Sequence, residues 1–186
     1  MNTTARTLRA FALTASCALL GAALLGGCAN PATPEPAQRS AEPIAALSPA
    51  APPATADLST PEAAVRSYLD WISYAYRIAV SDAASQTMTP EEGVRVDSYV
   101  QFNLQERDRR INQQIVEFKI RKQAAEASRA TLAATERWQY GYLSRGGERS
   151  TSPTYTTSFE TTYTLVKLPA GWVVDSVEAK PLDEVK

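Results

Sequence analysis

The stretch Tyr155-Thr-Thr-Ser-Phe-Glu-Thr-Thr-Tyr-Thr-Leu165 decides the fold class of this 186-residue chain. Its aromatic and aliphatic residues all lie at odd positions, whereas the even positions carry only threonine, serine and glutamate. Because successive side chains of a strand point to opposite faces, this alternation predicts a β-strand with one buried face. Threonine, tyrosine and phenylalanine are also favoured in strands. The C-terminal half is therefore expected to form a sheet.

Three more strands are predicted around this one. Pro169-Ala-Gly171 is typical of a turn, so residues 172–177 are expected to return as the second strand of a hairpin. Upstream, residues 131–142 carry Leu132, Ala134, Trp138 and Tyr140 at even spacing. Residues 116–121 alternate in the same way, with Val116, Phe118 and Ile120 on the apolar face. Four consecutive strands favour an antiparallel meander.

Two helix starts precede the strands, and both have the same signature. Thr60-Pro61 and Thr89-Pro90 each place a capping residue before a proline at the first helical position. Glu92 follows Thr89 by three residues, the capping-box position. Apolar residues then recur at helical spacing: Val65, Tyr68, Leu69, Ile72, Tyr76 and Ala79 in the first helix, and Val96, Tyr99 and Val100 in the second. We expect the second helix to end in the charged stretch 106–110.

Helices followed by strands indicate an α+β domain, which we assign to residues 59–186. We expect the N-terminal helices to pack on one face of a curved antiparallel sheet of about four strands. A curved sheet wrapped on helices forms a cone, and its open mouth is a natural place for a pocket.

Three segments carry a resemblance to a known family. They are Arg129-Ala-Thr-Leu-Ala-Ala-Thr-Glu136, the Tyr155–Leu165 strand and Gly171-Trp172-x-Val174. Together they resemble the plastid-division intermembrane-space domain of the accumulation-and-replication-of-chloroplasts family, which is similar in turn to the nuclear transport factor 2-like cone. The resemblance spans residues 61–180, and it implies a cone-like fold and a role in gripping a partner's peptide in the cell envelope.

The first 27 residues read as a bacterial lipoprotein signal peptide. Arg6 and Arg9 precede a mostly apolar run of 16 residues, 10–25, which is short for a membrane span. Leu25-Gly-Gly-Cys28 then resembles the lipobox, in which the cysteine is the residue that receives lipid. Cys28 is therefore the predicted lipidation site, and Cys17 lies within the segment that would be removed.

Residues 28–58 are expected to form a disordered tether after the lipidated cysteine. This segment is rich in alanine and proline and has no aromatic residue, so it cannot bury enough apolar surface to fold. The predicted location is the extracytoplasmic face of the cell envelope, with the lipid on Cys28 as the membrane partner. Ala29 in place of Asp after the cysteine favours the outer membrane in a Gram-negative cell, by resemblance to other lipoproteins.

Composition excludes several kinds of chemistry. The chain has no histidine, which removes catalytic triads of the Ser-His-Asp kind and histidine-based zinc sites. The one mature cysteine is predicted to be acylated, so thiol catalysis is excluded as well. The formal net charge is −1 with no basic stripe, which argues against nucleic acid as a partner. We predict no metal, no cofactor and no enzymatic activity.

The candidate site residues come from the strands. Glu136 shares the parity of its apolar neighbours Trp138 and Tyr140, so we expect its side chain to point inward. There its carboxylate would either pair with an arginine or have a raised pKa. Glu117, Glu160 and Asp175 are expected on solvated strand faces, next to basic residues. The aromatic residues of the predicted strands either belong to the core or line a pocket or interface. They are Trp138, Tyr140, Tyr155, Phe159, Tyr163 and Trp172.

Two functions remain open from these residues. The first is a non-catalytic protein-interaction module that binds an unknown envelope protein or peptide. The second is a cone that binds a small molecule or a lipid, and an enzyme that uses Glu136 is a more distant third. An enclosed apolar cavity of roughly 300 Å³ or more would favour the second function, whereas a filled interior with exposed aromatics at its rim would favour the first. The arginines at 107, 109 and 110 suit either an anionic partner or a solvated helix end.

Overall fold

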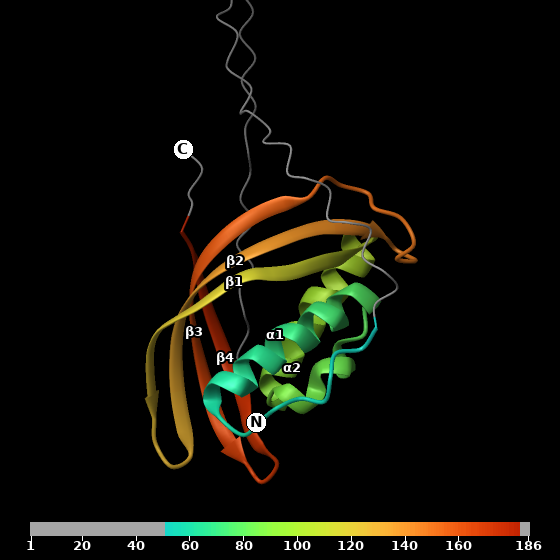
Figure 1. Ribbon diagram of the computed structural model, residues 1–186. Coiled ribbons are helices and arrows are strands. Elements are labelled where there is room, and N and C mark those ends of the chain that lie inside the picture. The colour runs from blue at the N-terminus through green and yellow to red at the C-terminus, as the bar shows by residue number, and fades with distance from the viewer. Residues whose placement is uncertain (1–50, 183–186) are drawn as a thin grey trace, which may run out of the picture. The chain divides into compact units, whose positions relative to one another are not determined.

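The computed structural model describes residues 51–182, so the predicted signal peptide, Cys28 and most of the tether lie outside the described residues. Helices come first and strands follow, as predicted (Figure 1). The elements, in chain order, are α1 (Pro61–Ile78), the 3-10 helix η1 (Ser81–Thr87), α2 (Pro90–Gln101), the π-helical turn η2 (Phe102–Glu106), β1 (Arg109–Ala125), β2 (Arg129–Ser144), β3 (Tyr155–Leu168) and β4 (Gly171–Pro181).

The start of α1 is the one that the sequence predicted. Thr60 caps the helix by accepting a hydrogen bond from the Ala63 amide at 3.1 Å, and Pro61 occupies the first turn. The predicted apolar stripe is confirmed as the buried face of the helix: Val65, Tyr68, Leu69, Ile72 and Tyr76. Ala79 ends the helix in the left-handed conformation.

The start of α2 confirms one half of the predicted capping box and corrects the other. The Glu92 amide donates to the Thr89 hydroxyl at 3.4 Å. The Thr89 amide, however, donates to the carbonyl of Val174 at 2.9 Å, so it is not available to the Glu92 carboxylate. That carboxylate turns into the core, and Glu92 is only 3% exposed. A tertiary contact has therefore replaced the local one.

One further expectation for α2 was wrong. Tyr99 does not belong to the core stripe, since it is 47% exposed whereas Val96 and Val100 are buried. The predicted end of the helix in the charged stretch 106–110 is confirmed, because η2 continues α2 without a break and stops at Glu106. Strand β1 then begins at Arg109.

The four strands form an antiparallel meander in the order β1-β2-β3-β4, as predicted. In the register of β2 with β3, Tyr140 lies opposite Tyr155 and Leu132 lies opposite Tyr163. Each strand extends beyond its predicted range. The extra length bends over the helices, and Figure 1 shows α1 lying beneath the arch that β1 and β2 make.

A β-bulge in β1 overturns one predicted side-chain direction. Ile115 pairs with Trp138 and Glu117 pairs with Arg137, so Val116 is left without a partner and is 40% exposed. One extra residue in a strand reverses the alternation on either side of it. The sequence alternation of residues 116–121 is therefore right for Phe118 and Ile120, which pack against the core, and wrong for Val116.

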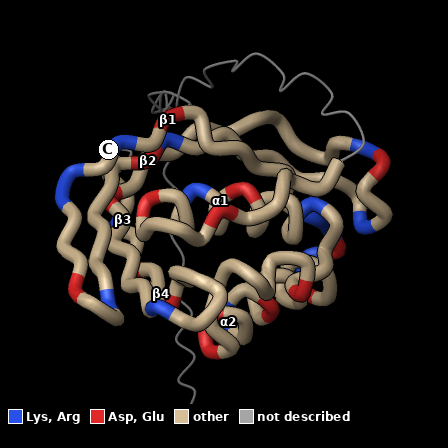
Figure 2. Tube along the Cα trace, turned by 60° about the horizontal axis from the view of Figure 1, so that its bottom comes forward, with Lys and Arg blue, Asp and Glu red and all other residues tan. Residues whose placement is uncertain are grey.

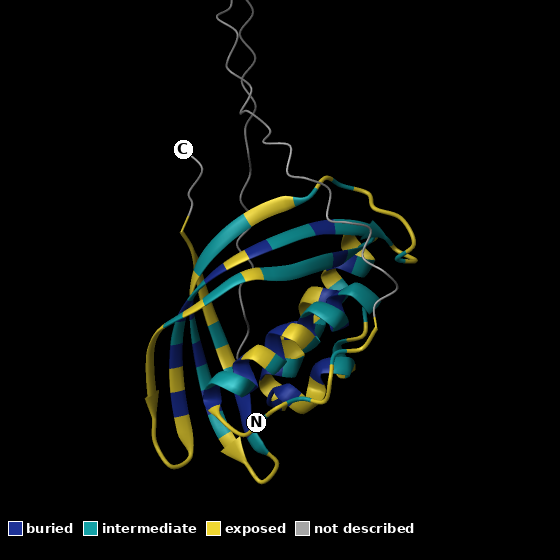
Figure 3. Ribbon diagram, viewed as in Figure 1, coloured by how far each residue is buried: buried dark blue, intermediate teal, exposed yellow. Residues whose placement is uncertain are grey.

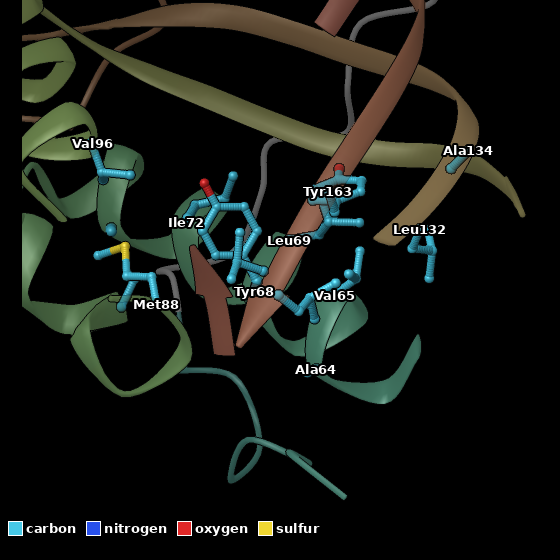
Figure 4. Packing of buried hydrophobic residues seen from close by; sticks show 14 of the residues in the cluster. Ala64, Val65, Tyr68, Leu69, Ile72, Met88, Val96, Leu132, Ala134 and Tyr163 are labelled. Carbon is cyan, nitrogen blue, oxygen red and sulfur yellow. The ribbon is translucent and has the colours of Figure 1, made fainter. Parts of the chain in front are cut away.

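The interior between α1 and the sheet is filled with side chains. Buried residues face one another from α1 and from the concave side of the sheet (Figure 3). Tyr68, Tyr163, Leu132 and Leu165 are each no more than 1% exposed. Figure 4 shows Val65, Tyr68 and Leu69 of α1 meeting the strand residues at the centre of this cluster. Helices and sheet thus share one core.

The chain just before α1 is fixed to the β3–β4 hairpin. The Trp172 amide donates to the Leu58 carbonyl at 2.8 Å, and the Asp57 amide donates to the Ser67 hydroxyl at 2.9 Å. Gly171 has φ +133°, and a Cβ there would lie 2.5 Å from the Leu58 oxygen. The ordered contacts of the domain therefore begin before residue 59. No helix among residues 51–182 is both long enough and apolar enough to cross a bilayer.

Candidate functional site

The structure distributes the seven candidate side chains over three places. Glu136, Trp138 and Tyr163 are buried beneath α1, and Phe159 is partly buried in the strand register opposite Glu136. Tyr140 and Tyr155 lie together where β2 ends and β3 begins. Trp172 is buried at the other end of β3, opposite Lys167. One pocket therefore does not hold all seven residues.

Glu136 points inward, as its parity predicted, and it is 3% exposed. The Trp138 indole Nε1–H donates to its Oε2 at 2.8 Å, and the Tyr163 hydroxyl donates to its Oε1. Burial raises the pKa of Glu136, and the hydrogen bonds from Tyr163 and Trp138 oppose that rise. Of the two expectations for an inward carboxylate, a raised pKa is therefore the one that holds, and no described arginine pairs with it.

A second buried carboxylate lies on the helical side of the core. The Tyr68 hydroxyl donates to Glu92 Oε1 at 2.5 Å, and the Arg95 Nε–H donates to Glu92 Oε2 at 2.8 Å. Arg95 also donates to the Tyr68 hydroxyl at 3.2 Å. The Glu92 side chain is 2% exposed, whereas that of Arg95 is 54% exposed, so this ion pair reaches from solvent into the core.

The two carboxylates belong to one buried cluster. The rings of Tyr68 and Tyr163 meet edge to face with their centroids 6.3 Å apart. Burial raises the pKa of both tyrosine hydroxyls well above the ordinary value, and the neighbouring carboxylates, Glu92 and Glu136 respectively, raise them further. The cluster, which we call the Glu–Tyr network, consists of Glu92, Arg95, Tyr68, Tyr163, Glu136 and Trp138.

The centre of the Glu–Tyr network leaves no room for a reactant beside its two tyrosines. Tyr68 and Tyr163 are each 1% exposed, so solvent hardly reaches them, and the network meets solvent through Arg95. Within the described residues, no group of three histidine, cysteine or acidic side chains is arranged to hold a metal ion. The hydrogen bonds of the network join α1 to α2 and β2 to β3, and the edge-to-face contact of Tyr68 with Tyr163 links the helical half to the sheet half.

A second group of aromatic side chains lies at the surface. Ring centroids are 5.3 Å apart for Tyr140 and Tyr155 and 6.3 Å apart for Tyr142 and Tyr155. The guanidinium carbon of Arg109 lies 3.4 Å from the centroid of the Tyr142 ring. Tyr155 is 41% exposed.

Tyr99 joins this group from α2. Burial raises the pKa of Tyr140, the neighbouring Tyr142, Tyr155 and Tyr99 raise it further, and Arg109 lowers it. The ring of Tyr99 meets that of Tyr76 edge to face with the centroids 5.5 Å apart, and its electrostatic effect on Tyr140 places the two side chains in the same neighbourhood. We call this set the tyrosine–arginine surface: Tyr99, Arg109, Tyr140, Tyr142 and Tyr155.

The sequence found only part of this surface. Tyr140 and Tyr155 share the inward parity of their strands, which made them candidates. Tyr142 lay at the last position of its predicted strand, and Tyr99 looked like a core residue. Their meeting depends on the register of β2 with β3 and on the course of the chain through η2, neither of which the local pattern contains.

The arginines at 107, 109 and 110 are each held by the domain itself. Arg109 donates from Nε to Asn103 Oδ1 at 3.0 Å, Arg110 donates from Nε to the Arg145 carbonyl at 2.6 Å, and Arg107 lies over the Phe102 ring at 5.2 Å. None of the three forms an ion pair with an acidic side chain in residues 51–182.

Two of the three acidic strand residues expected on solvated faces are found there. Glu117 forms ion pairs with Lys119 and, at 3.6 Å, with Arg137, and Glu160 is exposed. Asp175 is half-buried at the register shift between β3 and β4. Figure 2 shows basic and acidic residues interspersed over the domain. The open depression of about 400 Å³ between residues 56–59 and 167–171 contains none of the seven candidate residues.

Comparison with known proteins shows similarity of fold. No protein-family model matches the chain, and no curated protein matches it in sequence. The intermembrane-space region of the chloroplast protein ARC6 superposes with a TM-score of 0.52 and 15% identity, over 69% of this chain and 99% of that one. A nuclear transport factor 2-like protein from Salmonella enterica superposes with a TM-score of 0.44 and 14% identity, over 66% of this chain and 89% of that one.

A putative calcium/calmodulin-dependent protein kinase II association domain from Xanthomonas campestris superposes with a TM-score of 0.46 and 12% identity, over 71% of this chain and 95% of that one. The predicted resemblance to the plastid intermembrane-space domain is thus confirmed at the level of fold, as is the α+β class. At this level of identity the similarity concerns the fold alone.

Proposed function

We propose that this chain is a non-catalytic interaction module that its lipidated Cys28 holds at the extracytoplasmic face of a bacterial membrane. The module binds a partner protein or peptide through the tyrosine–arginine surface. The observation that carries this proposal is the contrast between the two aromatic groups. The inner group is filled and closed, whereas the outer group presents Tyr99 at 47% and Tyr155 at 41% exposure.

The filled interior argues against the alternative of a small-molecule or lipid-binding cone. A ligand of that kind needs a concave site that covers most of its surface. Leu132 and Leu165, which would line such a cavity on the concave face, are fully buried by protein atoms. A ligand would have to displace the α1 side chains that fill the same space.

The outer group has the composition of a binding surface. Tyrosine combines a large apolar ring with one polar group, and tyrosine and arginine are enriched among the residues that dominate binding energy. The rings of Tyr140, Tyr142 and Tyr155 hold one another in place, so little conformational freedom is lost when a partner binds. Arg109 adds a cation whose position is fixed by Tyr142 and Asn103.

The replacement Tyr155→Ala tests the binding role. Loss of an exposed aromatic anchor costs about 2 kcal/mol or more, which corresponds to about 30-fold weaker binding. Full-length protein in detergent is used to capture partners from membranes of the producing cell, and captured proteins are quantified by mass spectrometry. A partner is expected with the wild type and lost with Tyr155→Ala.

Leu168→Ala is the matched control, because Leu168 is 44% exposed on the same strand but at its other end. It is expected to capture the same partner as the wild type. Equal capture by all three proteins would refute the proposed surface. A co-purified lipid or small molecule in place of any protein would favour the alternative function.

Cys28→Ser tests the anchor. Without the thiol no lipid is attached, and the protein is expected to leave washed membranes and appear in the soluble extract, because residues 51–182 form the folded core without Cys28. Fractionation followed by immunoblotting measures the distribution, and circular dichroism checks the fold. Cys17→Ser, which alters the other cysteine of the chain, is the control and should stay with the membrane. Retention of Cys28→Ser on washed membranes would contradict lipid anchoring.

A further inference from the structure

We infer that the partner of the tyrosine–arginine surface is an acidic peptide segment, in which carboxylates alternate with apolar side chains. This inference rests on the proposed function and specifies the chemistry of the partner. It starts from the charges that surround the tyrosines, on the two chain segments that meet at this end of the sheet.

Positive charge is concentrated at that end. Residues 106–110 and 145–149 together carry five arginines and three acidic residues, a net charge of +2 (5 − 3), in a chain whose formal net charge is −1. The two segments are in contact, since Arg145 donates to the Leu104 carbonyl at 2.9 Å and Arg110 donates to the Arg145 carbonyl. Their charges therefore act on the same part of the surface.

The arginines of the first segment are not neutralised by the domain. Asp108 is engaged by Arg145 at 3.3 Å, whereas Arg107, Arg109 and Arg110 have no acidic partner among residues 51–182. They contrast with Arg66, Arg95 and Arg137, which lie elsewhere and are each paired with a glutamate.

Arg109 is the side chain best placed to meet a carboxylate. Its guanidinium stacks on the Tyr142 ring and its Nε–H is fixed on Asn103, so the planar fork is already oriented. A guanidinium binds a carboxylate with two parallel hydrogen bonds, and a neighbouring aromatic surface excludes water from that pair. Tyr140, Tyr142 and Tyr155 provide that surface, and their rings also offer contacts to apolar side chains.

A peptide fits this arrangement better than a lipid headgroup layer. The charged groups are interleaved with half-exposed aromatic rings, so carboxylates and apolar side chains must be presented alternately within one ligand. An extended peptide does this with its side chains, whereas a bilayer surface presents its charged layer above its apolar layer.

The test is a selection from a random 12-residue peptide library displayed on phage, with full-length protein in detergent as the target. Peptides that also bind the Tyr99→Ala/Tyr155→Ala double variant are removed. We expect the retained peptides to be enriched at least about threefold in aspartate and glutamate over the starting library. The consensus peptide, synthesised with a fluorophore, should bind Arg109→Gln at least about 10-fold more weakly than the wild type.

Arg137→Gln is the charge-matched control, since Arg137 is an exposed arginine on the outer face of the sheet; its affinity should stay within about twofold of the wild type. Arg107→Gln, at an exposed position, is a second variant in case Arg109→Gln is less stable, and it should weaken binding in the same direction. Raising the sodium chloride concentration should weaken the wild-type complex as well, because salt screens exposed charges.

The outcomes separate this inference from the proposed function. Retained peptides without acidic enrichment, or with equal affinity for Arg109→Gln and Arg137→Gln, would overturn the acidic partner while the binding surface stands. If no peptide is retained, the acidic-peptide inference is refuted. If vesicles containing phosphatidylglycerol then bind in an Arg109-dependent way, the ligand is an anionic lipid surface.

Discussion

Replacing Glu136 by alanine is expected to lower the free energy of unfolding by about 3 kcal/mol. The change leaves the Trp138 indole N–H and the Tyr163 hydroxyl without their acceptor in a closed core. Each hydrogen bond to a charged group contributes about 1.5–3 kcal/mol, and relief from burying the carboxylate offsets part of their loss. Urea denaturation followed by circular dichroism measures the difference.

Glu160→Ala is the matched control for this prediction. Glu160 lies on the neighbouring strand β3 but is exposed, so its removal should change stability by less than about 0.5 kcal/mol. If Glu136→Ala is as stable as Glu160→Ala, the hydrogen bonds of Glu136 do not stabilise the fold.

The same residue gives the domain a defined pH dependence. Burial raises the folded-state pKa of Glu136 above its ordinary value, so the folded state binds the proton more tightly than the unfolded state. Its contribution is therefore fully present below the unfolded pKa and is lost as the pH rises through the folded pKa. The stability of the wild type relative to Glu136→Gln should increase as the pH falls from about 7 to about 4.5. A decrease over that range would show that the folded pKa is lowered.

Replacing Glu92 by alanine is the second large expected effect, a loss of about 2–3 kcal/mol. The Tyr68 hydroxyl would lose its acceptor in the core, and Arg95 would lose both hydrogen bonds to the carboxylate. Because Arg95 is half exposed, water can solvate its charge, which keeps the cost below that of a fully buried orphan charge. Thermal and urea denaturation measure the loss.

Glu91→Ala is the control for Glu92→Ala. Both glutamates lie in the first turn of α2, where a negative charge near the helix N-terminus contributes about 0.3–1 kcal/mol, but Glu91 is exposed. A loss of that small size for both variants would mean that Glu92 acts only as a helix-terminal charge. A clearly larger loss for Glu92→Ala would assign its effect to the contact with Tyr68.

These two predictions bear on binding because the Glu–Tyr network holds the elements that carry the tyrosine–arginine surface. Tyr99 comes from α2, which Glu92 joins to α1 through Tyr68. Tyr140 and Tyr155 come from β2 and β3, which Glu136 joins through Tyr163. The edge-to-face contact of Tyr68 with Tyr163 connects the two halves. The inner cluster thus gives the outer surface a rigid support.

Local pattern predicted the elements well where one interaction dominates. The Thr-Pro starts of α1 and α2 fix helix starts through a cap and a preset backbone angle, and both are found at the predicted residues. The alternation from Tyr155 to Leu165 forms β3 from its first residue, and the strand continues to Leu168. Local pattern gave the wrong direction for Val116, where a bulge adds one residue, and for Tyr99, which touches the core through Tyr76 and is 47% exposed.

The candidate site was only half visible in the sequence for a similar reason. Parity within one strand correctly turned Glu136 inward, since side-chain direction in a strand is a local property. Parity could not reveal Glu92 as a core residue, because its partner Tyr68 is 24 residues away and the local capping rule gave another assignment. Nor could parity separate Trp172 from Tyr155, which the hairpin register places at opposite ends of the sheet.

Spacing and composition within short segments were enough to predict the α+β class, the strand order and the inward direction of Glu136. Lipidation at Cys28 stays a prediction from the same kind of local pattern. The folded chain was needed to show that the centre of the core is filled, that Glu92 and Glu136 share one buried network, and that Tyr99 and Arg109 lie on one surface with three strand tyrosines. Those features depend on the packing of side chains from distant segments, and packing is set by the shape of the whole domain.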